Sequence, residues 1–170
     1  MFFAPPAPLA TKVFASYPAQ YHTATDSNDW ALTQPHSSSH HTSLLEGPSF
    51  DRNGVLWCVD IPNGRILNVS AEGVFSVFKH YDGWPTGLKI HRDGRVFITD
   101  AKHGVMVLDP VSGKIEPYLV RAGLERFKGV NDLFFAANGD MWFTDQGLTG
   151  WQDPSGRLFR VRADGAIDCV

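Results

Sequence analysis

The feature of this sequence that most constrains its fold is a turn-and-strand motif that occurs three times. Each copy begins with Asn or Asp followed by Gly, continues with β-branched and aromatic residues, and ends on Asp. The copies are Asn53–Asp60, Asp93–Asp100 and Asn138–Asp145, and they begin 40 and 45 residues apart. Asn-Gly and Asp-Gly favour tight hairpin turns because those turns need positive φ. β-branched and aromatic residues favour strands, so each copy predicts a hairpin turn that leads into a strand.

Further apolar runs surround each motif, so that the repeating unit contains four short strands. One run precedes each turn, at residues 49–50, 88–90 and 133–135. A third run follows each motif, at residues 66–69, 105–108 and 158–161. After a polar turn comes a fourth run, at residues 74–78, 115–119 and 166–170. Four short antiparallel strands in about 40–45 residues is the period of a β-propeller blade.

We therefore predict an all-β fold, an incomplete β-propeller of three four-stranded blades. The blades are expected to span about residues 44–80, 81–125 and 126–170. A β-sandwich is the alternative fold, but a sandwich does not require a repeated turn motif. Three blades form a wedge with two open sheet edges, and such edges favour pairing with another chain. Self-association of two copies, or a fragment of a longer protein, are both consistent with this pattern.

The first 43 residues do not repeat and are rich in Pro, Ser and His. Within them, Lys12–Tyr17 is expected to form a strand that completes the last blade, and Thr23–Ser43 is expected to be a loop. His36, His40 and His41 lie close together and raise the possibility of a zinc site. They stand in a Ser-rich stretch with no Cys partner, so a solvated loop is the favoured interpretation.

Composition excludes several classes of partner. The net charge is −3 and no run of Lys and Arg occurs, which argues against nucleic acid and anionic membrane surfaces. No apolar run reaches the roughly 18 residues that a membrane-spanning helix needs. The N-terminus lacks a basic leader and is interrupted by prolines, so a secretory signal is not expected. A cytoplasmic location is predicted, with Cys58 and Cys169 as reduced thiols.

The repeat also gives a frame for locating a site. Glu46, Thr86 and Asn131 each lie seven residues before the turn residue of their repeat. They are therefore expected at equivalent positions, where the innermost strand of each blade meets the central channel. Converging carboxylate and amide oxygens favour a hard cation such as Ca²⁺ or Mg²⁺. Three unrelated polar loop residues are the alternative interpretation.

Three segments carry a resemblance to a known family. Leu45–Pro48, Gly83–Leu88 and Gly129–Leu133 resemble the segments that open successive blades in the gluconolactonase/senescence-marker-protein (regucalcin-like) family, and the resemblance covers residues 44–170. A related enzyme, diisopropyl fluorophosphatase, has a similar Gly-x-Asn-Asp segment. The resemblance implies a six-bladed β-propeller with one catalytic divalent cation, usually calcium, in its channel. It also implies hydrolysis of lactones or, in some members, of phosphorus–fluorine bonds.

By this resemblance, Glu46 and Asn131 are metal ligands, for Ca²⁺ or another divalent cation such as Mg²⁺ or Zn²⁺. Asp132 would orient a ligand or a water molecule, and Thr86 would contact the substrate. Asp145 precedes a longer loop that is expected to border the pocket, so it is a second candidate for substrate binding. In the family, later blades carry another Asn ligand and the catalytic Asp, and this sequence has no counterpart of them. The catalytic residue therefore stays unknown.

The aspartate that ends each copy of the motif has a different expected role. Asp60, Asp100 and Asp145 end the second strand of each repeat, and recurrence in every blade favours a structural function, such as accepting backbone N–H bonds. The expected activity is metal-dependent hydrolysis of a small-molecule lactone or related ester. An inactive truncated form, an organophosphate hydrolase and a non-catalytic propeller binding module remain open, so enzymatic activity itself is uncertain.

Overall fold

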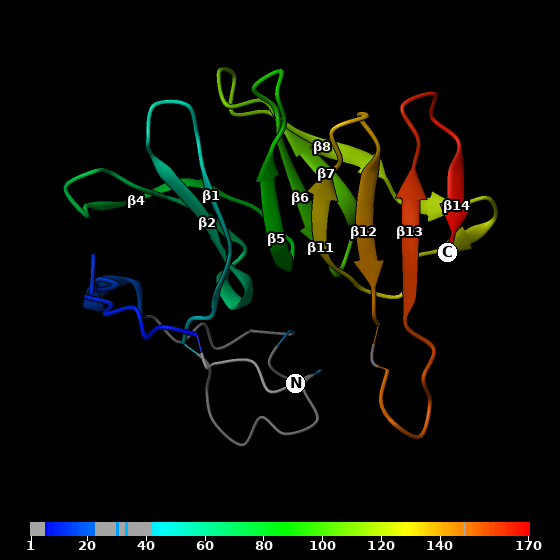
Figure 1. Cartoon of the computed structure of the whole chain (residues 1–170), viewed down its shortest axis with the longest axis horizontal. Coiled ribbons are helices and arrows are strands. Elements are labelled where there is room, and N and C mark those ends of the chain that lie inside the picture. The colour runs from blue at the N-terminus through cyan, green and yellow to red at the C-terminus, as the bar shows by residue number, and fades with distance from the viewer. Residues whose placement is uncertain (1–5, 23–29, 31–32, 34–41, 148) are drawn as a thin grey trace.

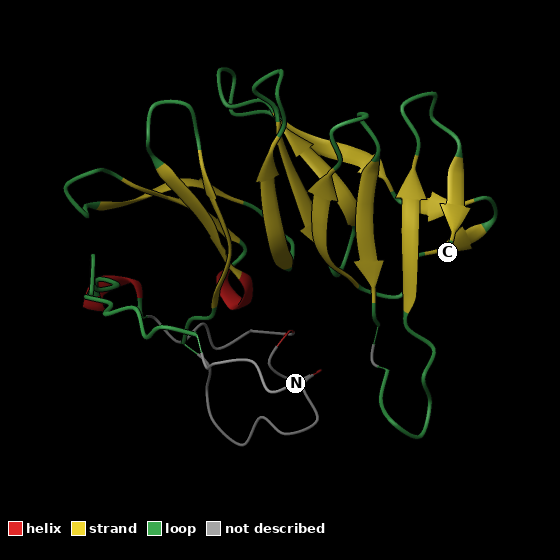
Figure 2. Ribbon diagram, viewed as in Figure 1, coloured by secondary structure: helices red, strands yellow, loops and turns green. Residues whose placement is uncertain are grey.

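Three four-stranded antiparallel sheets make up the body of the molecule. The computed structural model describes residues 6–22, 30, 33, 42–147 and 149–170. The sheets follow one another along the chain and lie side by side (Figure 1), each with its strands in sequence order. They do not close into a ring, so the predicted all-β, incomplete β-propeller is confirmed. Figure 2 shows strands throughout the three sheets, with helix only in short 3₁₀ turns in this part of the chain.

The strands have the following bounds. The first sheet contains β1 (Leu45–Phe50), β2 (Leu56–Asp60), β3 (Arg65–Val69) and β4 (Phe75–His80). The second contains β5 (Pro85–Ile90), β6 (Val96–Asp100), β7 (Gly104–Leu108) and β8 (Ile115–Leu119). The third contains β11 (Val130–Phe135), β12 (Met141–Asp145), β13 (Arg157–Val161) and β14 (Ile167–Cys169). A small hairpin of β9 (Arg121–Ala122) and β10 (Glu125–Arg126) joins the second sheet to the third, and the 3₁₀ turns are η1 (Ala19–Tyr21) and η2 (Ile61–Asn63).

The repeated motif forms the hairpin between the first and second strands of every sheet. Its glycines, Gly54, Gly94 and Gly139, have φ of 78°, 94° and 91°. A residue with a Cβ is strained at such values, which explains why Gly recurs there. The turn is the same in all three sheets, because each glycine donates its N–H to the carbonyl oxygen three residues earlier at 2.9–3.1 Å.

A bulge recurs in the first strand of each sheet. The pairing of that strand with its neighbour shifts by one residue between Glu46 and Ser49, between Pro85 and Gly87, and between Val130 and Leu133. An extra residue of this kind bends the strand and changes the direction in which nearby side chains point. The bulge therefore sets the direction in which the side chains of Glu46, Thr86 and Asn131 point.

The hydrophobic core lies between neighbouring sheets. One cluster joins the first sheet to the second and includes Trp57, Val59, Ile66, Leu88, Val96, Ile98, Met106 and Leu108. The other joins the second sheet to the third and includes Phe97, Val105, Val130, Leu133, Met141, Phe143, Phe159 and Val161. Alternate residues of the second sheet thus serve opposite cores, as the period of a strand requires.

The first strands of neighbouring sheets approach closely, and glycine permits the contact. A Cβ added at Gly47 would clash with the backbone of Gly87 and Leu88. A Cβ added at Gly87 would lie 2.7 Å from Asp132 Oδ1 and 2.8 Å from the carbonyl oxygen of Asn131. Strands β1, β5 and β11 are therefore stacked against one another with no room for side chains at these points.

A buried carboxylate holds the end of the second strand in every sheet. Asp60, Asp100 and Asp145 are fully buried. Asp60 Oδ1 accepts the N–H of Leu44 at 3.1 Å, and Asp145 Oδ1 accepts those of Lys128 and Gly129, both at 2.8 Å. Asp100 Oδ1 instead accepts N–H groups from the turn that follows it, at 2.8 and 2.9 Å. The predicted structural role, acceptance of backbone N–H bonds, is confirmed.

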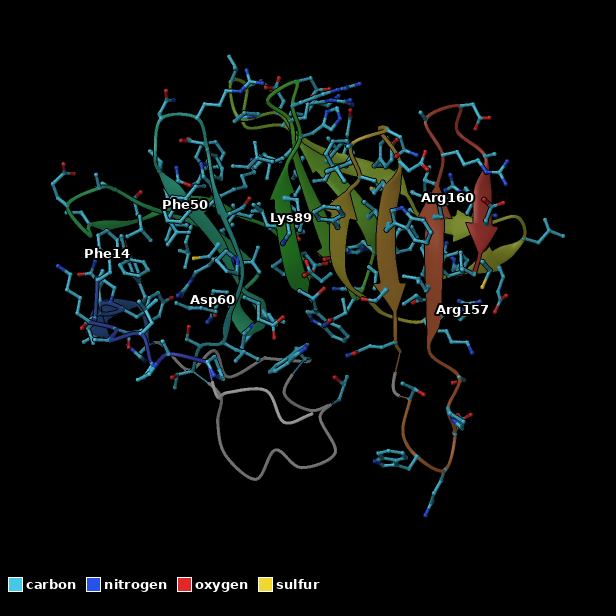
Figure 3. All side chains as sticks on the ribbon, in the orientation of Figure 1. Phe14, Phe50, Asp60, Lys89, Arg157 and Arg160 are labelled. Carbon is cyan, nitrogen blue, oxygen red and sulfur yellow. The ribbon has the colours of Figure 1, made fainter. Side chains whose placement is uncertain are left out.

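The second oxygen of each carboxylate has a different partner in each sheet. Tyr17 donates its hydroxyl to Asp60 Oδ2 at 3.0 Å, and Tyr81 donates to Asp100 Oδ2 at 2.7 Å. In the third sheet, Arg157 pairs with Asp145 Oδ2 at 2.6 Å. Figure 3 shows Asp60 near the end of β2 and Arg157 near the start of β13, at the same end of the sheets. The carboxylates are thus satisfied within the fold, as buried charges must be.

The N-terminal segment differs from its prediction. Residues 12–17 form no strand, and the chain turns into the 3₁₀ helix η1 after Pro18. The segment is attached by side chains: Tyr17 bonds to Asp60 and its ring contacts that of Phe75, with centroids 5.4 Å apart. A strand needs a backbone ladder, whereas these contacts join the segment to a sheet through its side chains. The three clustered histidines, His36, His40 and His41, lie outside the described residues, as does most of 23–43.

Apolar side chains remain exposed on the two outer faces of the wedge. Phe50 of the first sheet is 67% exposed and Phe134 of the third is 63% exposed. Phe134 follows the core residue Leu133, and Phe50 follows Ser49, which pairs with the core residue Trp57. Strand alternation therefore turns both rings away from the second sheet; Phe50 is labelled in Figure 3. Self-association through these faces or through the sheet edges stays a prediction. Among the described residues, no helix is long and apolar enough to cross a membrane.

The contact between β5 and β11 can be tested by substitution. We expect Gly87→Ala to lower the free energy of unfolding by about 1–3 kcal/mol, because the new methyl group overpacks a backbone contact. Gly150→Ala is the matched control, since a Cβ there meets nothing within 4 Å. Its effect should stay within about 0.5 kcal/mol. Urea unfolding followed by fluorescence measures both, and equal effects would contradict the proposed clash.

The buried carboxylate of the third sheet gives a second prediction. Asp145→Asn removes the negative charge opposite Arg157 while keeping the size of the side chain. We expect it to lower the free energy of unfolding by about 2 kcal/mol, because the mostly buried guanidinium loses its buried partner and keeps only the more exposed Glu125, at 2.8 Å. Asp168→Asn breaks the exposed pair with Arg162 and should lower it by less than about 1 kcal/mol. Denaturant unfolding distinguishes the two, and a small effect of Asp145→Asn would refute the structural role.

Candidate functional site

The strand pairing confirms the equivalence that the sequence frame predicted. Leu45, Pro85 and Val130 pair with the buried aspartates Asp60, Asp100 and Asp145. The residues that follow them in their strands are Glu46, Thr86 and Asn131, in that order. These three therefore occupy the same position in β1, β5 and β11, next to the bulge in each strand.

Thr86 links the second and third sheets. The residue is only 7% exposed. Its hydroxyl lies 3.1 Å from the carbonyl oxygen of Thr99 and 2.8 Å from that of Val130. Thr99 in turn donates its hydroxyl to the carbonyl oxygen of Asn131 at 2.7 Å. The two threonines fix the backbone that carries Asn131. A direct contact of Thr86 with substrate stays a prediction.

Glu46 is a half-buried acid that senses the charge of Asp132. Partial burial raises the pKa of Glu46 above its ordinary value, and the negative charge of Asp132 raises it further. Asp132 is itself more than half exposed and lies 3.3 Å from the ammonium group of Lys89, which Figure 3 shows on β5. Asp132 Oδ1 also accepts the N–H of Leu133 at 2.8 Å. This part of the surface thus carries two acids and one partly buried lysine.

The residues at this position fit a divalent cation by charge but supply few ligands. The ionised form of a partly desolvated carboxylate is stabilised when a cation binds beside it. Glu46 offers carboxylate oxygens and Asn131 an amide oxygen, which are ligands that Ca²⁺ and Mg²⁺ prefer. Calcium takes about six to eight oxygens. In the part of the chain that the structure describes, no group of three or more His, Cys, Asp or Glu side chains gathers around a common point.

A pocket of about 210 Å³ lies beside Thr86 and Asn131. We call it the channel pocket. Besides these two residues, its described lining consists of Trp30, Thr33, Ile61, Trp84, Ala101, Lys128, Gly129, Val130, Gln146 and Gly147. Apolar and aromatic walls with a few amide and ammonium groups are typical of small-molecule sites. Glu46, Asp132 and Asp145 do not belong to this lining, so the predicted site residues are only partly brought together.

Sequence reasoning missed most of the pocket wall, although the repeat contained a signal for it. Ile61, Ala101 and Gln146 each follow the buried aspartate of their sheet, and all three line the channel pocket. The same frame that selected Glu46 and Asn131 would have selected them. Lys128 had no such signal, because it belongs to a connection that does not repeat. Asp145 lies fully buried behind Gln146, and its predicted contact with substrate stays a prediction.

Comparisons with known proteins agree with the fold and its repeat. The family model for the SMP-30/Gluconolactonase/LRE-like region matches residues 44–170. A lactonase drp35 of Staphylococcus aureus (strain MRSA252) is 30% identical over 128 residues, which are 71% of this chain and 38% of that protein. A gluconolactonase of Zymomonas mobilis is 30% identical over 148 residues, 74% of this chain and 42% of the relative. The chain therefore spans less than half the length of these relatives.

Solved structures show the same arrangement of sheets. A gluconolactonase from Xanthomonas campestris superposes with a TM-score of 0.66 at 21% identity, over 75% of this chain and 47% of that one. A virginiamycin B lyase from Staphylococcus aureus superposes with a TM-score of 0.56 at 16% identity, over 81% of this chain and 43% of that one. At such low identities these two similarities concern the fold alone. With the family model covering residues 44–170, the chain belongs to the SMP-30/gluconolactonase/LRE-like family.

Proposed function

We propose that the protein to which this chain belongs hydrolyses small-molecule lactones with the help of a divalent cation, and that Glu46 and Asn131 supply part of the ligands. One observation carries the proposal. Glu46 is a partly buried carboxylate whose pKa is raised by burial and by the charge of Asp132, and it stands at the strand position that Asn131 occupies beside the channel pocket. The lactonases among its relatives support the substrate class. Calcium is the proposed cation, as the resemblance to the family implies, and both donors are oxygens, which suit it.

The chain's own residues would bind and orient the substrate. Ile61, Trp84 and Ala101 form an apolar wall of the channel pocket that excludes water from one face of a lactone ring. Asn131 and Gln146 offer amide N–H groups to ring or hydroxyl oxygens. A bound cation supplies Lewis-acid polarisation of the lactone carbonyl. Among the described residues, no carboxylate lines this pocket, so the group that removes a proton from water is not assigned.

Positioning of Asn131 depends on its neighbours in the second sheet. Its backbone carbonyl oxygen accepts a hydrogen bond from the hydroxyl of Thr99. The carbonyl oxygen of the preceding residue, Val130, lies 2.8 Å from the hydroxyl of Thr86. Gly87 lets β11 approach until no side chain fits between the strands. These contacts fix the strand at the bulge, so the Asn131 side chain starts from a defined backbone. A fixed ligand loses less conformational freedom when it binds a cation.

A calcium titration tests the proposed cation ligand. We expect Ca²⁺ to raise the unfolding temperature of the protein, because a ligand that binds only the folded state stabilises it by mass action. Glu46→Gln should abolish most of the rise, whereas Glu116→Gln, an exposed change on β8, should preserve it. Hydrolysis of δ-gluconolactone, measured by base uptake at constant pH, should require the cation and fall at least about tenfold in Glu46→Gln. Hydrolysis that is unchanged in Glu46→Gln would refute the proposal, and stabilisation by calcium without hydrolysis would favour a binding module.

The pH dependence of stability tests the environment of Glu46 without any cation. The pKa of Glu46 is raised on folding from its ordinary value of 4.5, so its ionised form is disfavoured in the folded state. Its contribution to stability is therefore complete below about pH 4.5 and is lost as the pH rises through the folded pKa. We expect Glu46→Gln to be more stable than the parent at pH 7 in a chelator, and the difference to vanish at pH 4. Urea unfolding at the two pH values measures this, and a variant less stable at pH 7 would contradict it.

A further inference from the structure

A second pocket lies at the opposite end of the sheets, between the hairpin turns of the first and second sheets. Its volume is about 260 Å³, and we call it the turn pocket. Its lining consists of Asp51, Arg52, Asn53, Trp57, Ile90, His91, Gly94, Val96 and Pro110. All of these belong to the first two sheets or their turns, so the pocket needs no part of the third sheet. It shares no lining residue with the channel pocket.

Part of the wall of the turn pocket is apolar and held in place. Trp57 is 5% exposed and Val96 is 1% exposed, and both belong to the core between the first two sheets. Trp57 donates its indole N–H to Asp51 Oδ2 at 3.1 Å and its ring packs against Phe78. An apolar cavity of roughly 150 Å³ is enough to bind benzene. The turn pocket therefore has room for an apolar body of about two fused rings.

The acidic groups at the rim are already engaged. Asp51 accepts the Trp57 indole and the N–H groups of Asn53 and Val55, at 2.8–3.1 Å. Asp93 pairs with Arg95 at 2.7 Å and with His91 at 2.9 Å. These contacts fix both carboxylates within their own turns. Neither carboxylate is therefore available to pair with Arg52 or Arg92, the other two arginines at the rim.

In the described part of the chain, Arg52 has no carboxylate partner. It reaches from the first turn to the second, where one of its N–H groups donates to the carbonyl oxygen of Arg92 at 2.6 Å. Within the described residues, neither Arg52 nor Arg92 has an acid at ion-pair distance. A guanidinium carries five N–H donors, so Arg52 retains donors for an anion. The turn itself does not need this residue, because the equivalent position in the third sheet is Ala137 and the turn hydrogen bonds are the same.

We propose that the turn pocket binds a small ligand with an apolar body of about two rings and one carboxylate, which pairs with Arg52. The apolar body would lie against Ile90 and Pro110, which are partly exposed, and the carboxylate would lie at the rim. A guanidinium and a carboxylate form paired, charge-assisted hydrogen bonds. Since Arg52 is already held by the carbonyl of Arg92, little side-chain freedom is lost when the ligand binds. The site is independent of the cation and of lactone hydrolysis.

Titration of the 170-residue chain with 2-naphthoate tests the proposal. Calorimetry should show saturable binding of one equivalent, and two-dimensional NMR should show shifts of the Trp57 indole N–H and the Gly94 amide. Arg52→Gln should weaken binding by about tenfold, the usual effect of losing a charged hydrogen-bond partner. The neutral amide of the same ring system, 2-naphthamide, should bind the parent more weakly by a similar factor.

Lys128→Gln is the matched control, because it removes a cation from the lining of the channel pocket. It should leave the affinity for 2-naphthoate unchanged. Arg52 is exposed, so the Arg52→Gln variant should stay folded and give the NMR spectrum of a folded protein. Three results would each overturn the proposal: no saturable binding, equal affinity of the parent and Arg52→Gln, or loss of affinity in Lys128→Gln instead. Shifts confined to residues around Trp84 would likewise place the ligand in the other pocket.

Discussion

A buried carboxylate at the end of the second strand determines how each sheet is positioned at its channel end. In the first and third sheets it accepts N–H groups of the segment that leads into the first strand, through Leu44 and through Lys128 and Gly129. A carboxylate removed from water must be surrounded by donors, so the chain that supplies them is held tightly. The next residues along the chain are those of the candidate site. Asp100 binds the turn after β6 instead, and there Thr86 makes the connection to β11.

Much of this arrangement was predictable from the sequence because it repeats. The recurrence of Asn/Asp-Gly and a terminal Asp indicated the blades, and counting back from the turn placed Glu46 and Asn131 at equivalent positions. That count succeeded because the bulge occurs in all three first strands and shifts each by the same amount. The structural role of Asp60 and Asp100 followed from the same regularity, whereas Asp145 was also predicted to contact substrate.

What does not repeat was harder to predict. Residues 12–17 have the composition of a strand, yet the structure attaches them through Tyr17 to a carboxylate and an aromatic ring. Lys128 reaches the channel pocket from a connection found once in the chain. The contacts of Thr86 and Thr99 cross between sheets, and no pattern within a single repeat reveals a hydrogen bond to the next. Turn composition likewise gave no sign that Arg52 would span two hairpins.

The placement of the core has a consequence for how the molecule comes apart. Every sheet is built from consecutive strands, and the two apolar clusters each join only adjacent sheets. Such a molecule behaves as a linear array in which cooperativity passes between nearest neighbours. Local opening of the third sheet would expose one cluster and leave the other intact. The outer units therefore protect the middle one, whose backbone amides should be the slowest in the chain to exchange with solvent.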